Sequence, residues 1–127
     1  MTVSERVWNR AALEDGGLSP GPGDTALASL LLLHGLIMNG GVHHAIECVG
    51  PSRLLAAADG YAYFGFPDVC TFFRGAAGDP MLSTWTDDTE VLANRRYSEM
   101  ISDDSLLLTR FEETLDRRRD QFAPIET

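Results

Sequence analysis

The chain has 127 residues, 44% of them hydrophobic, which is enough for one domain that buries its own core. Nineteen acidic side chains outnumber ten basic ones, all of them arginine, and the net charge is −9 at pH 7. This balance argues against direct binding of nucleic acid, because proteins that bind phosphates gather lysine and arginine on one surface.

A short first helix is predicted at the start of the chain. Thr2 and Glu5 have the spacing of a capping box, in which each side chain accepts a hydrogen bond from the backbone of the other. Val3, Val7 and Ala11 repeat at helical spacing and predict the face that packs on the core.

A glycine- and proline-rich stretch, residues 15–23, is expected to be a flexible linker, because neither residue type favours regular structure. Asp24 is the expected N-cap of a second helix over residues 25–38. This helix is apolar on nearly all sides, so we predict that it is the buried centre of the domain.

Glycine breaks are predicted on both sides of the next helix, which covers residues 42–49. Gly40 and Gly41 permit positive φ angles and a close approach of helices, while Asn39 is expected to adopt a left-handed conformation or to cap the following helix. Gly50 ends that helix, and the proline after it suits the first position of another.

The second half of the chain predicts three more helices. Pro67 opens a short one that stops near residues 75–78. Residues 87–90 place carboxylates in the first turn of a helix that runs to about Met100, and they have the spacing of a second capping box.

The last helix is expected to begin near Asp103 or Asp104 and to carry arginines at its end, residues 117–119. Its apolar face is predicted to hold Leu108, Phe111, Leu115 and Phe122. No alternating strand is evident, so the sequence predicts a single compact all-α domain, residues 1–127, with six or seven helices around the buried central one.

Histidines near the glycine break suggest a metal site, which we weigh against simple packing. His43 and Glu47 are four residues apart on a helix, as are His44 and Cys48, and His34 lies one helix earlier. The His-Glu-x-x-His spacing of zinc hydrolases is absent, so we expect these histidines to pack or form hydrogen bonds, with no metal and no cofactor.

The cysteines and the apolar segments indicate a cytoplasmic location. Cys48 and Cys70 lie in apolar stretches without metal-type spacing or a secretory signal, so reduced, buried thiols are expected. The longest apolar run, residues 26–38, is interrupted by His34 and Gly35 and is shorter than the roughly 20 residues of a membrane span. We therefore expect no membrane association.

No catalytic pattern stands out in the sequence. A Gly-x-Ser-x-Gly elbow and a phosphate-binding loop are both absent, and the adjacent aspartates occupy expected cap positions. The aromatic residues of the middle segment are expected to be core and dimer contacts, although they can also line an enzyme pocket: Tyr61, Tyr63, Phe64, Phe66, Phe72 and Phe73.

An acidic interaction surface is the main functional prediction from charge. Carboxylates at i, i+3 and i+4 lie close together on a helix and can form a charged row. The candidate residues are Asp87, Asp88, Asp103, Asp104, Glu112, Glu113, Asp116 and Asp120. Pairs from Glu113 to Arg117 and from Asp116 to Arg119 are also favourably spaced, so the last helix can instead neutralise itself.

The order of these parts resembles a bacterial all-helical domain family of unknown function whose motif is Asn-Gly-Gly-Phe followed two residues later by glutamine. Asn39, Gly40 and Gly41 match, while Val42 replaces the aromatic residue and His44 the glutamine. The resemblance covers residues 24–122. One member of the family is an acidic dimeric DNA mimic, so the resemblance implies a helical homodimer with an interaction role.

Three functions follow as alternatives. The first is a non-enzymatic, DNA-mimic-like regulator whose acidic surface binds a basic DNA-binding protein, with salt-sensitive affinity. The second is an immunity-type or accessory module that recognises a toxin or enzyme by shape and is nearly indifferent to salt. The third is an enzyme of unrecognised type, which requires a concave pocket with perturbed titratable groups.

Overall fold

The computed structural model describes residues 1–78 and 85–125, and within them the fold is entirely helical. The elements are α1 (Val3–Glu14), α2 (Pro22–Tyr63), α3 (Pro67–Ala77), α4 (Asp87–Met100), α5 (Asp104–Arg117) and the 3-10 helix η2 (Arg119–Gln121). The all-α prediction is confirmed. The described part has five α-helices where the sequence predicted six or seven, because three predicted segments are joined in α2.

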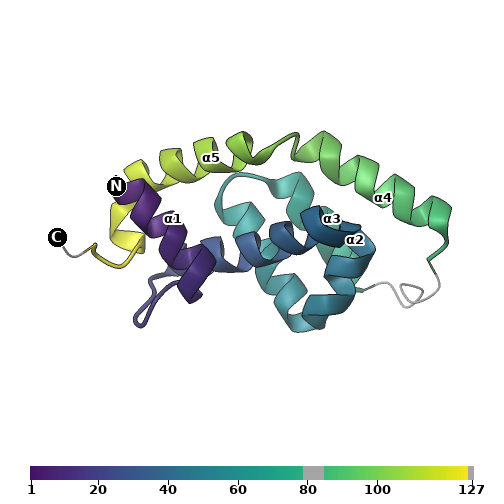
Figure 1. Ribbon diagram of the computed structural model, residues 1–127, viewed down its shortest axis with the longest axis horizontal. Coiled ribbons are helices and arrows are strands. Elements are labelled where there is room, and N and C mark those ends of the chain that lie inside the picture. The colour runs from purple at the N-terminus through teal and green to yellow at the C-terminus, as the bar shows by residue number, and fades with distance from the viewer. Residues whose placement is uncertain (79–84, 126–127) are drawn as a thin grey trace.

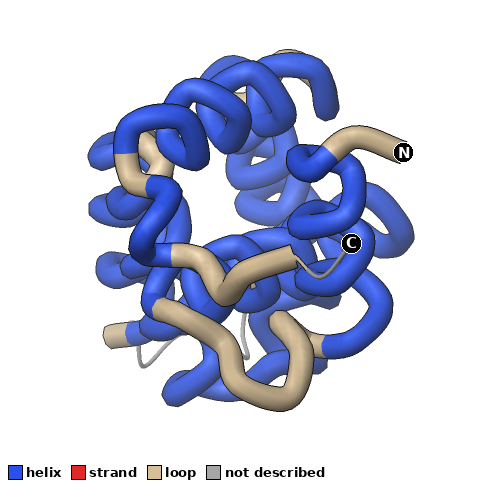
Figure 2. The backbone as a smooth tube through the Cα atoms, turned by 90° about the vertical axis from the view of Figure 1, so that its left-hand side faces the viewer, coloured by secondary structure: helices blue, strands red, loops and turns tan. Residues whose placement is uncertain are grey.

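The five α-helices are arranged in two layers. Figure 1 shows α4 and α5 following one another along one side of the molecule, with α1, α2 and α3 on the other side of the core. Figures 1 and 2 also show that both termini lie at the same end of the molecule. This arrangement leaves the outer side of α4 and α5 open to solvent.

Helix α1 begins as its sequence predicts. The Thr2 hydroxyl accepts a hydrogen bond from the backbone N–H of Glu5 at 3.1 Å, and the Glu5 carboxylate accepts one from the N–H of Thr2 at 2.9 Å. Val7 and Ala11 are buried, whereas Val3 is 37% exposed. The apolar face of α1 is therefore shorter than predicted, because its first turn lies beyond the core.

Helix α2 begins three residues before the predicted start, so the assignment of Asp24 as its N-cap is wrong. Gly21 is the N-cap and Pro22 is the first helical residue, a position that suits a residue without an N–H. The buried carboxylate of Asp24 accepts hydrogen bonds from the N–H of Gly21 at 2.9 Å and of Ala123 at 2.7 Å, and pairs with Arg10 at 2.8 Å. Asp24 thus joins α1, α2 and the C-terminal segment.

The predicted glycine breaks are confirmed as two turns within α2. Gly41 has φ 90° and Gly50 has φ 79°, conformations that residues with a Cβ rarely adopt. They divide α2 into a first portion (residues 22–40), a second (42–49) and a third (51–63). The third portion packs closely against the first, since a Cβ added to Gly60 would lie 2.5 Å from the carbonyl oxygen of Ala26.

The first portion of α2 is buried on one face only. Its buried apolar side chains are Leu27, Ala28, Leu30, Leu33 and Ile37. On the opposite face Leu32 is 43% exposed, and Met38, near the end of this portion, is 58% exposed. The expectation of a helix buried on nearly all sides therefore does not hold, because no element of the described chain covers this second face.

The aromatic residues are chiefly core residues. Seven of them are at most 7% exposed and form two sets of ring contacts. One set is Tyr61, Phe66, Phe73 and Tyr97, and the other is Phe64, Phe111 and Phe122. Tyr63 and Phe72 are partly buried at the edge of the core. Most of the aromatic side chains expected at a dimer contact are thus hidden inside one copy of the chain.

The apolar face of α5 differs from the prediction by one residue. Leu107, Phe111 and Leu115 are buried, while Leu108 is 40% exposed. Leu107 lies four residues and Leu108 three residues before Phe111, so helical spacing can place either leucine on the same face as Phe111. Only the position of the core determines which of the two is buried. Phe122 lies beyond the end of α5, yet its ring reaches Phe111 with 6.0 Å between centroids.

The two cysteines are free. Cys70 is partly buried, but Cys48 is exposed, so the expectation of two buried thiols is wrong for Cys48. The second portion of α2 is amphipathic, and Cys48 lies on its outer side, two residues from the buried Ile46.

Candidate functional site

The eight acidic residues predicted as an interaction surface all lie on α4, α5 and their flanking turns, and all are exposed. We call them the acidic face: Asp87, Asp88, Asp103, Asp104, Glu112, Glu113, Asp116 and Asp120. Helix α4 directs only Ala93 and Tyr97 into the core, and α5 buries one stripe, so the remaining sides of both helices face outward. The fold therefore presents all eight carboxylates to solvent.

Seven of these acids form three groups along the two helices. Asp87 and Asp88 are at the start of α4, Asp103 and Asp104 at its junction with α5, and the third group, residues 112–116, on α5 itself. Asp116 and Asp120 have the spacing of a helical row, but they do not form one, because α5 ends at Arg117 and Asp120 lies in η2.

Ion pairing leaves most of the acidic face unneutralised. Within the described residues, Asp104 is its one member within ion-pair distance of a basic side chain, at 2.7 Å from the His34 ring. The predicted pairs from Glu113 to Arg117 and from Asp116 to Arg119 are absent from the described structure. The last helix therefore does not neutralise itself as its spacing allowed.

Arginines interrupt the acidic face without pairing with it. Between Asp87 and Asp120 there are ten acidic side chains and six arginines, so four negative charges are in excess. Arg110 lies over the ring of Phe66, 5.6 Å from its centroid, and Arg118 lies over Tyr63 at 5.4 Å. The surface is three carboxylate groups separated by cations, and not the continuous row that the sequence suggested.

Local hydrogen bonds stabilise the ionised carboxylate of Asp103. As N-cap of α5, its carboxylate accepts from the hydroxyl of Ser105 and from the backbone N–H groups of Ser105 and Leu106. These bonds favour the ionised form and lower the pKa of Asp103 from its ordinary value. The start of α5 was predicted correctly because this cap is local in sequence.

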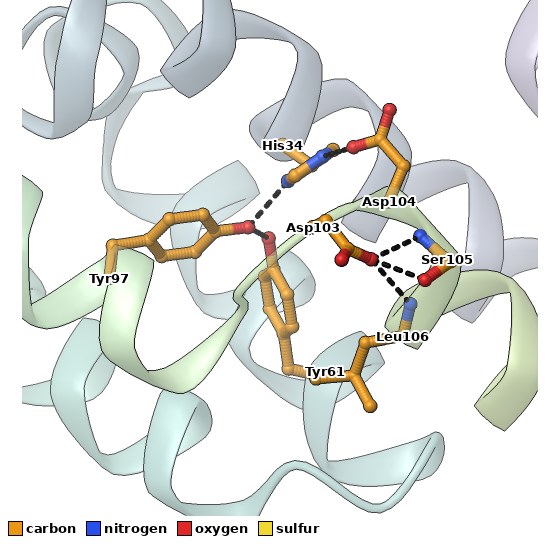
Figure 3. A network of polar contacts seen from close by, with 7 residues as sticks. All are labelled: His34, Tyr61, Tyr97, Asp103, Asp104, Ser105 and Leu106. Carbon is orange, nitrogen blue, oxygen red and sulfur yellow. Dashed lines mark hydrogen bonds and ion pairs between the residues drawn. The ribbon is translucent and has the colours of Figure 1, made fainter.

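A buried polar network joins the acidic face to the core. Figure 3 shows His34 between Asp104 and Tyr97, with Tyr61 beyond. The His34 ring is 2.7 Å from Asp104 through Nε2 and 2.7 Å from the Tyr97 hydroxyl through Nδ1, and the two tyrosine hydroxyls are 2.5 Å apart. If Nε2–H donates to the carboxylate, Nδ1 accepts from Tyr97, which in turn accepts from Tyr61.

This network fixes the position of α4 and of the start of α5. Its members come from the first and third portions of α2, from α4 and from α5. Burial raises the pKa of both Tyr61 and Tyr97, so both hydroxyls stay protonated. Sequence reasoning missed the network, because His34 and Tyr97 are 63 residues apart and no local spacing connects them.

The glycine corner is a joint between α2 and α4. Gly41 makes the turn, and the N–H of Val42 donates to the side-chain oxygen of Asn94 at 2.8 Å. Asn94 thus supplies the cap that was predicted for Asn39, which instead continues the helix. A Cβ at Gly40 would lie 2.3 Å from the exposed His44 ring. The His44 ring can therefore lie over the backbone of residue 40 only because that residue is glycine.

The other histidine of the corner contacts two carboxylates. His43 lies 2.9 Å from Glu47 and 3.2 Å from Glu90, and its ring is tilted against Trp85. The Cys48 sulfur is 3.7 Å from the ring of His44, on the helical spacing that the sequence predicted. In residues 1–78 and 85–125, no three potential ligand side chains are grouped to hold a metal ion.

Three pockets lie on the described surface, and one of them is lined by Asp104, the outermost member of the network. One of about 800 Å³ lies between α1 and α2, one of about 520 Å³ between α1 and α5, and one of about 870 Å³ beside the C-terminal segment. Neither Tyr61 nor Tyr97 lines any of them. The most strongly perturbed titratable groups therefore do not open into these pockets.

Comparison with known proteins adds no family to this description. No family model, curated protein or solved structure matches the chain. The functional argument therefore depends on the geometry and charge of the described residues, and the family resemblance remains an expectation.

Proposed function

We propose that the chain is a non-enzymatic protein-interaction domain whose acidic face binds a basic protein. The observation that carries this proposal is that all eight carboxylates are exposed and, within the described residues, only Asp104 lies within ion-pair distance of a basic side chain, His34. Unpaired surface carboxylates attract a basic partner over distances of about 10 Å at moderate salt.

The form of the acidic face favours a DNA-binding protein as the partner. Helices α4 and α5 follow one another for about 30 residues, which at 1.5 Å per residue is roughly 45 Å of surface. A contact of that length suits an extended basic surface, such as one that binds a nucleic-acid backbone. Direct binding of nucleic acid, a membrane or a cofactor is not part of this proposal.

Arginines within the same surface make the proposed recognition selective. Arg95 and Arg96 lie between the first two carboxylate groups, and residues 117–119 follow the third. A partner must therefore place its cations against the three acidic groups and avoid cations between them. A protein that binds any polyanion without such spacing is disfavoured.

A second candidate function is recognition by shape, as in an immunity-type or accessory module. The pocket of about 520 Å³ between α1 and α5 favours it, since Trp8 and Leu108 line an opening beside Asp104. Aromatic and aliphatic side chains in such hollows often dominate binding energy at interfaces. Binding of this kind would be nearly independent of salt.

Affinity capture from the native host distinguishes the two functions. The full chain is immobilised and bound proteins are identified at about 0.1 M and about 1 M salt, where the Debye length falls from roughly 10 to roughly 3 Å. The proposal expects DNA-binding proteins at low salt only, and their release by added duplex DNA. Partners retained at high salt and unaffected by DNA would support recognition by shape instead.

A further inference from the structure

An apolar groove crosses the side of the molecule formed by α1 and α2. Its volume is about 800 Å³, and its apolar lining includes Leu13, Leu31, Leu32, Leu36, Val49 and Ala56. None of the residues that line it belongs to α3, α4 or α5. The groove is therefore separate from the acidic face, and an occupant of one leaves the other free.

The groove exposes the most apolar part of the chain. Leu13 is 81% exposed and Leu32 is 43% exposed. By length and composition alone α2 is apolar enough to cross a membrane, yet only 39% of its most apolar 18-residue window is buried. Apolar surface that the described chain leaves open in this way commonly marks a binding surface.

Charge distinguishes the groove from the rest of this acidic molecule. Asp15 and Arg53 are the charged residues that line it, so the lining side chains carry no net charge, whereas the whole chain carries −9. Both side chains are exposed, and neither forms an ion pair within the described residues. The groove thus offers one acceptor and one donor of an ion pair on an otherwise uncharged surface.

We propose that a second copy of this chain covers the groove in a two-fold symmetric dimer. In such a dimer the same surface of both copies is in contact, so each Asp15 can face the Arg53 of the other copy. Two molecules of equal negative charge repel each other, and a neutral surface is where they approach at the least electrostatic cost. The acidic faces of both copies then remain exposed.

Gly35 provides a variant that blocks the groove without disturbing the fold. It lines the groove, and a Cβ added to it meets no atom within 4 Å. The residue is helical and has an ordinary φ, so an arginine there is compatible with the monomer and favours the helix. Gly35→Arg places a long charged side chain where the second copy would lie.

Sedimentation equilibrium of the full chain tests the proposal. Wild type is expected at twice the monomer mass of 13.9 kDa, and Gly35→Arg and Leu32→Asp at the monomer mass with unchanged circular dichroism. Leu92→Asp is the matched control, since Leu92 is 61% exposed on α4, away from the groove. This control is expected to remain dimeric.

The proposed ion pair has its own test. Arg53→Glu places two carboxylates together and is expected to weaken the dimer about tenfold or more, because each contact occurs twice in a symmetric dimer. Asp15→Asn added to this variant removes the repulsion and should restore most of the affinity. Asparagine is chosen because residue 15 has φ 53°, which asparagine tolerates.

Two results would overturn the proposal. One is a wild-type chain that remains monomeric at about 1 mM, the concentration at which even weak association of about 4 kcal/mol is detected. The other is a dimer that Gly35→Arg and Arg53→Glu leave intact. A monomer that floats with lipid vesicles would assign the groove to a membrane surface instead.

Discussion

Replacing Tyr97 by phenylalanine tests whether the buried network holds α4 on the core. The hydroxyl of Tyr97 contacts the His34 ring at 2.7 Å and the Tyr61 hydroxyl at 2.5 Å. The substitution removes one oxygen from a fully buried ring and leaves both partners without their hydrogen bond. No other contact of the ring needs to change.

The magnitude follows from the cost of buried polar groups without partners. Each of the two groups costs about 1–3 kcal/mol, so Tyr97→Phe is expected to lower the free energy of unfolding by about 2–6 kcal/mol. Tyr61→Phe removes one hydrogen bond and leaves Tyr97 bonded to His34, so we expect a loss of about 1 kcal/mol. For a domain of this size, 1 kcal/mol corresponds to roughly 4 °C in Tm.

Denaturant unfolding followed by circular dichroism measures these differences. Tyr63→Phe is the matched control, because the Tyr63 hydroxyl lies outside the network and forms no hydrogen bond with the described residues, so its removal should cost almost nothing. Amide exchange in α4 should accelerate in Tyr97→Phe, since Ala93 and Tyr97 are the buried residues of that helix. If Tyr97→Phe is no less stable than Tyr63→Phe, the network does not hold α4 in place.

Three further outcomes are expected. Gly41→Ala should lower stability by about 1–2 kcal/mol because of its φ of 90°, whereas Gly75→Ala, within α3 and with open space around it, should be neutral or stabilising in thermal melts. Asp24→Asn should cost about 3 kcal/mol in urea titrations, since it leaves Arg10 partly buried without its ion pair; a loss below 1 kcal/mol would refute the anchoring role. Stability should fall above pH 10, because tyrosines ionise at about 10.0 when unfolded, while burial raises the pKa of Tyr97 in the folded chain; a flat profile to pH 11 would contradict this.

Features that depend on neighbouring residues were predictable from the sequence. The capping box of Thr2 and Glu5, the start of α3 at Pro67 and the cap of α5 at Asp103 are confirmed. The turns at Gly41 and Gly50 are also confirmed. Each of these depends on backbone conformation or on hydrogen bonds within a few residues, which the local sequence encodes.

Features that depend on distant residues were missed. No local pattern indicates that Asn94 caps the helix at Val42, 52 residues away, or that Tyr97 contacts His34. The choice of Leu107 over Leu108 in the core also depends on where α2 lies. Helical spacing shows which residues share a face, but it does not show which other element that face meets.

The acidic residues show the same limit for the candidate site. Their exposure was predictable, because carboxylates rarely enter a core without partners. Their pairing was not, since Glu113 and Arg117 have favourable helical spacing and yet form no ion pair in the described structure. Side-chain entropy and solvation make such exposed pairs nearly neutral in energy, so spacing alone does not decide whether they form.

The most direct test of the account compares two chains that have lost the same charge from different places. Glu113→Gln with Asp116→Asn neutralises two carboxylates of the acidic face, and Glu14→Gln with Asp68→Asn neutralises two exposed carboxylates on α1 and α3. Affinity for a captured basic partner is measured for both by calorimetry at low salt. The account predicts a loss of about tenfold or more for the first chain and little change for the second. Equal losses would show that net charge, and not the face formed by α4 and α5, attracts the partner.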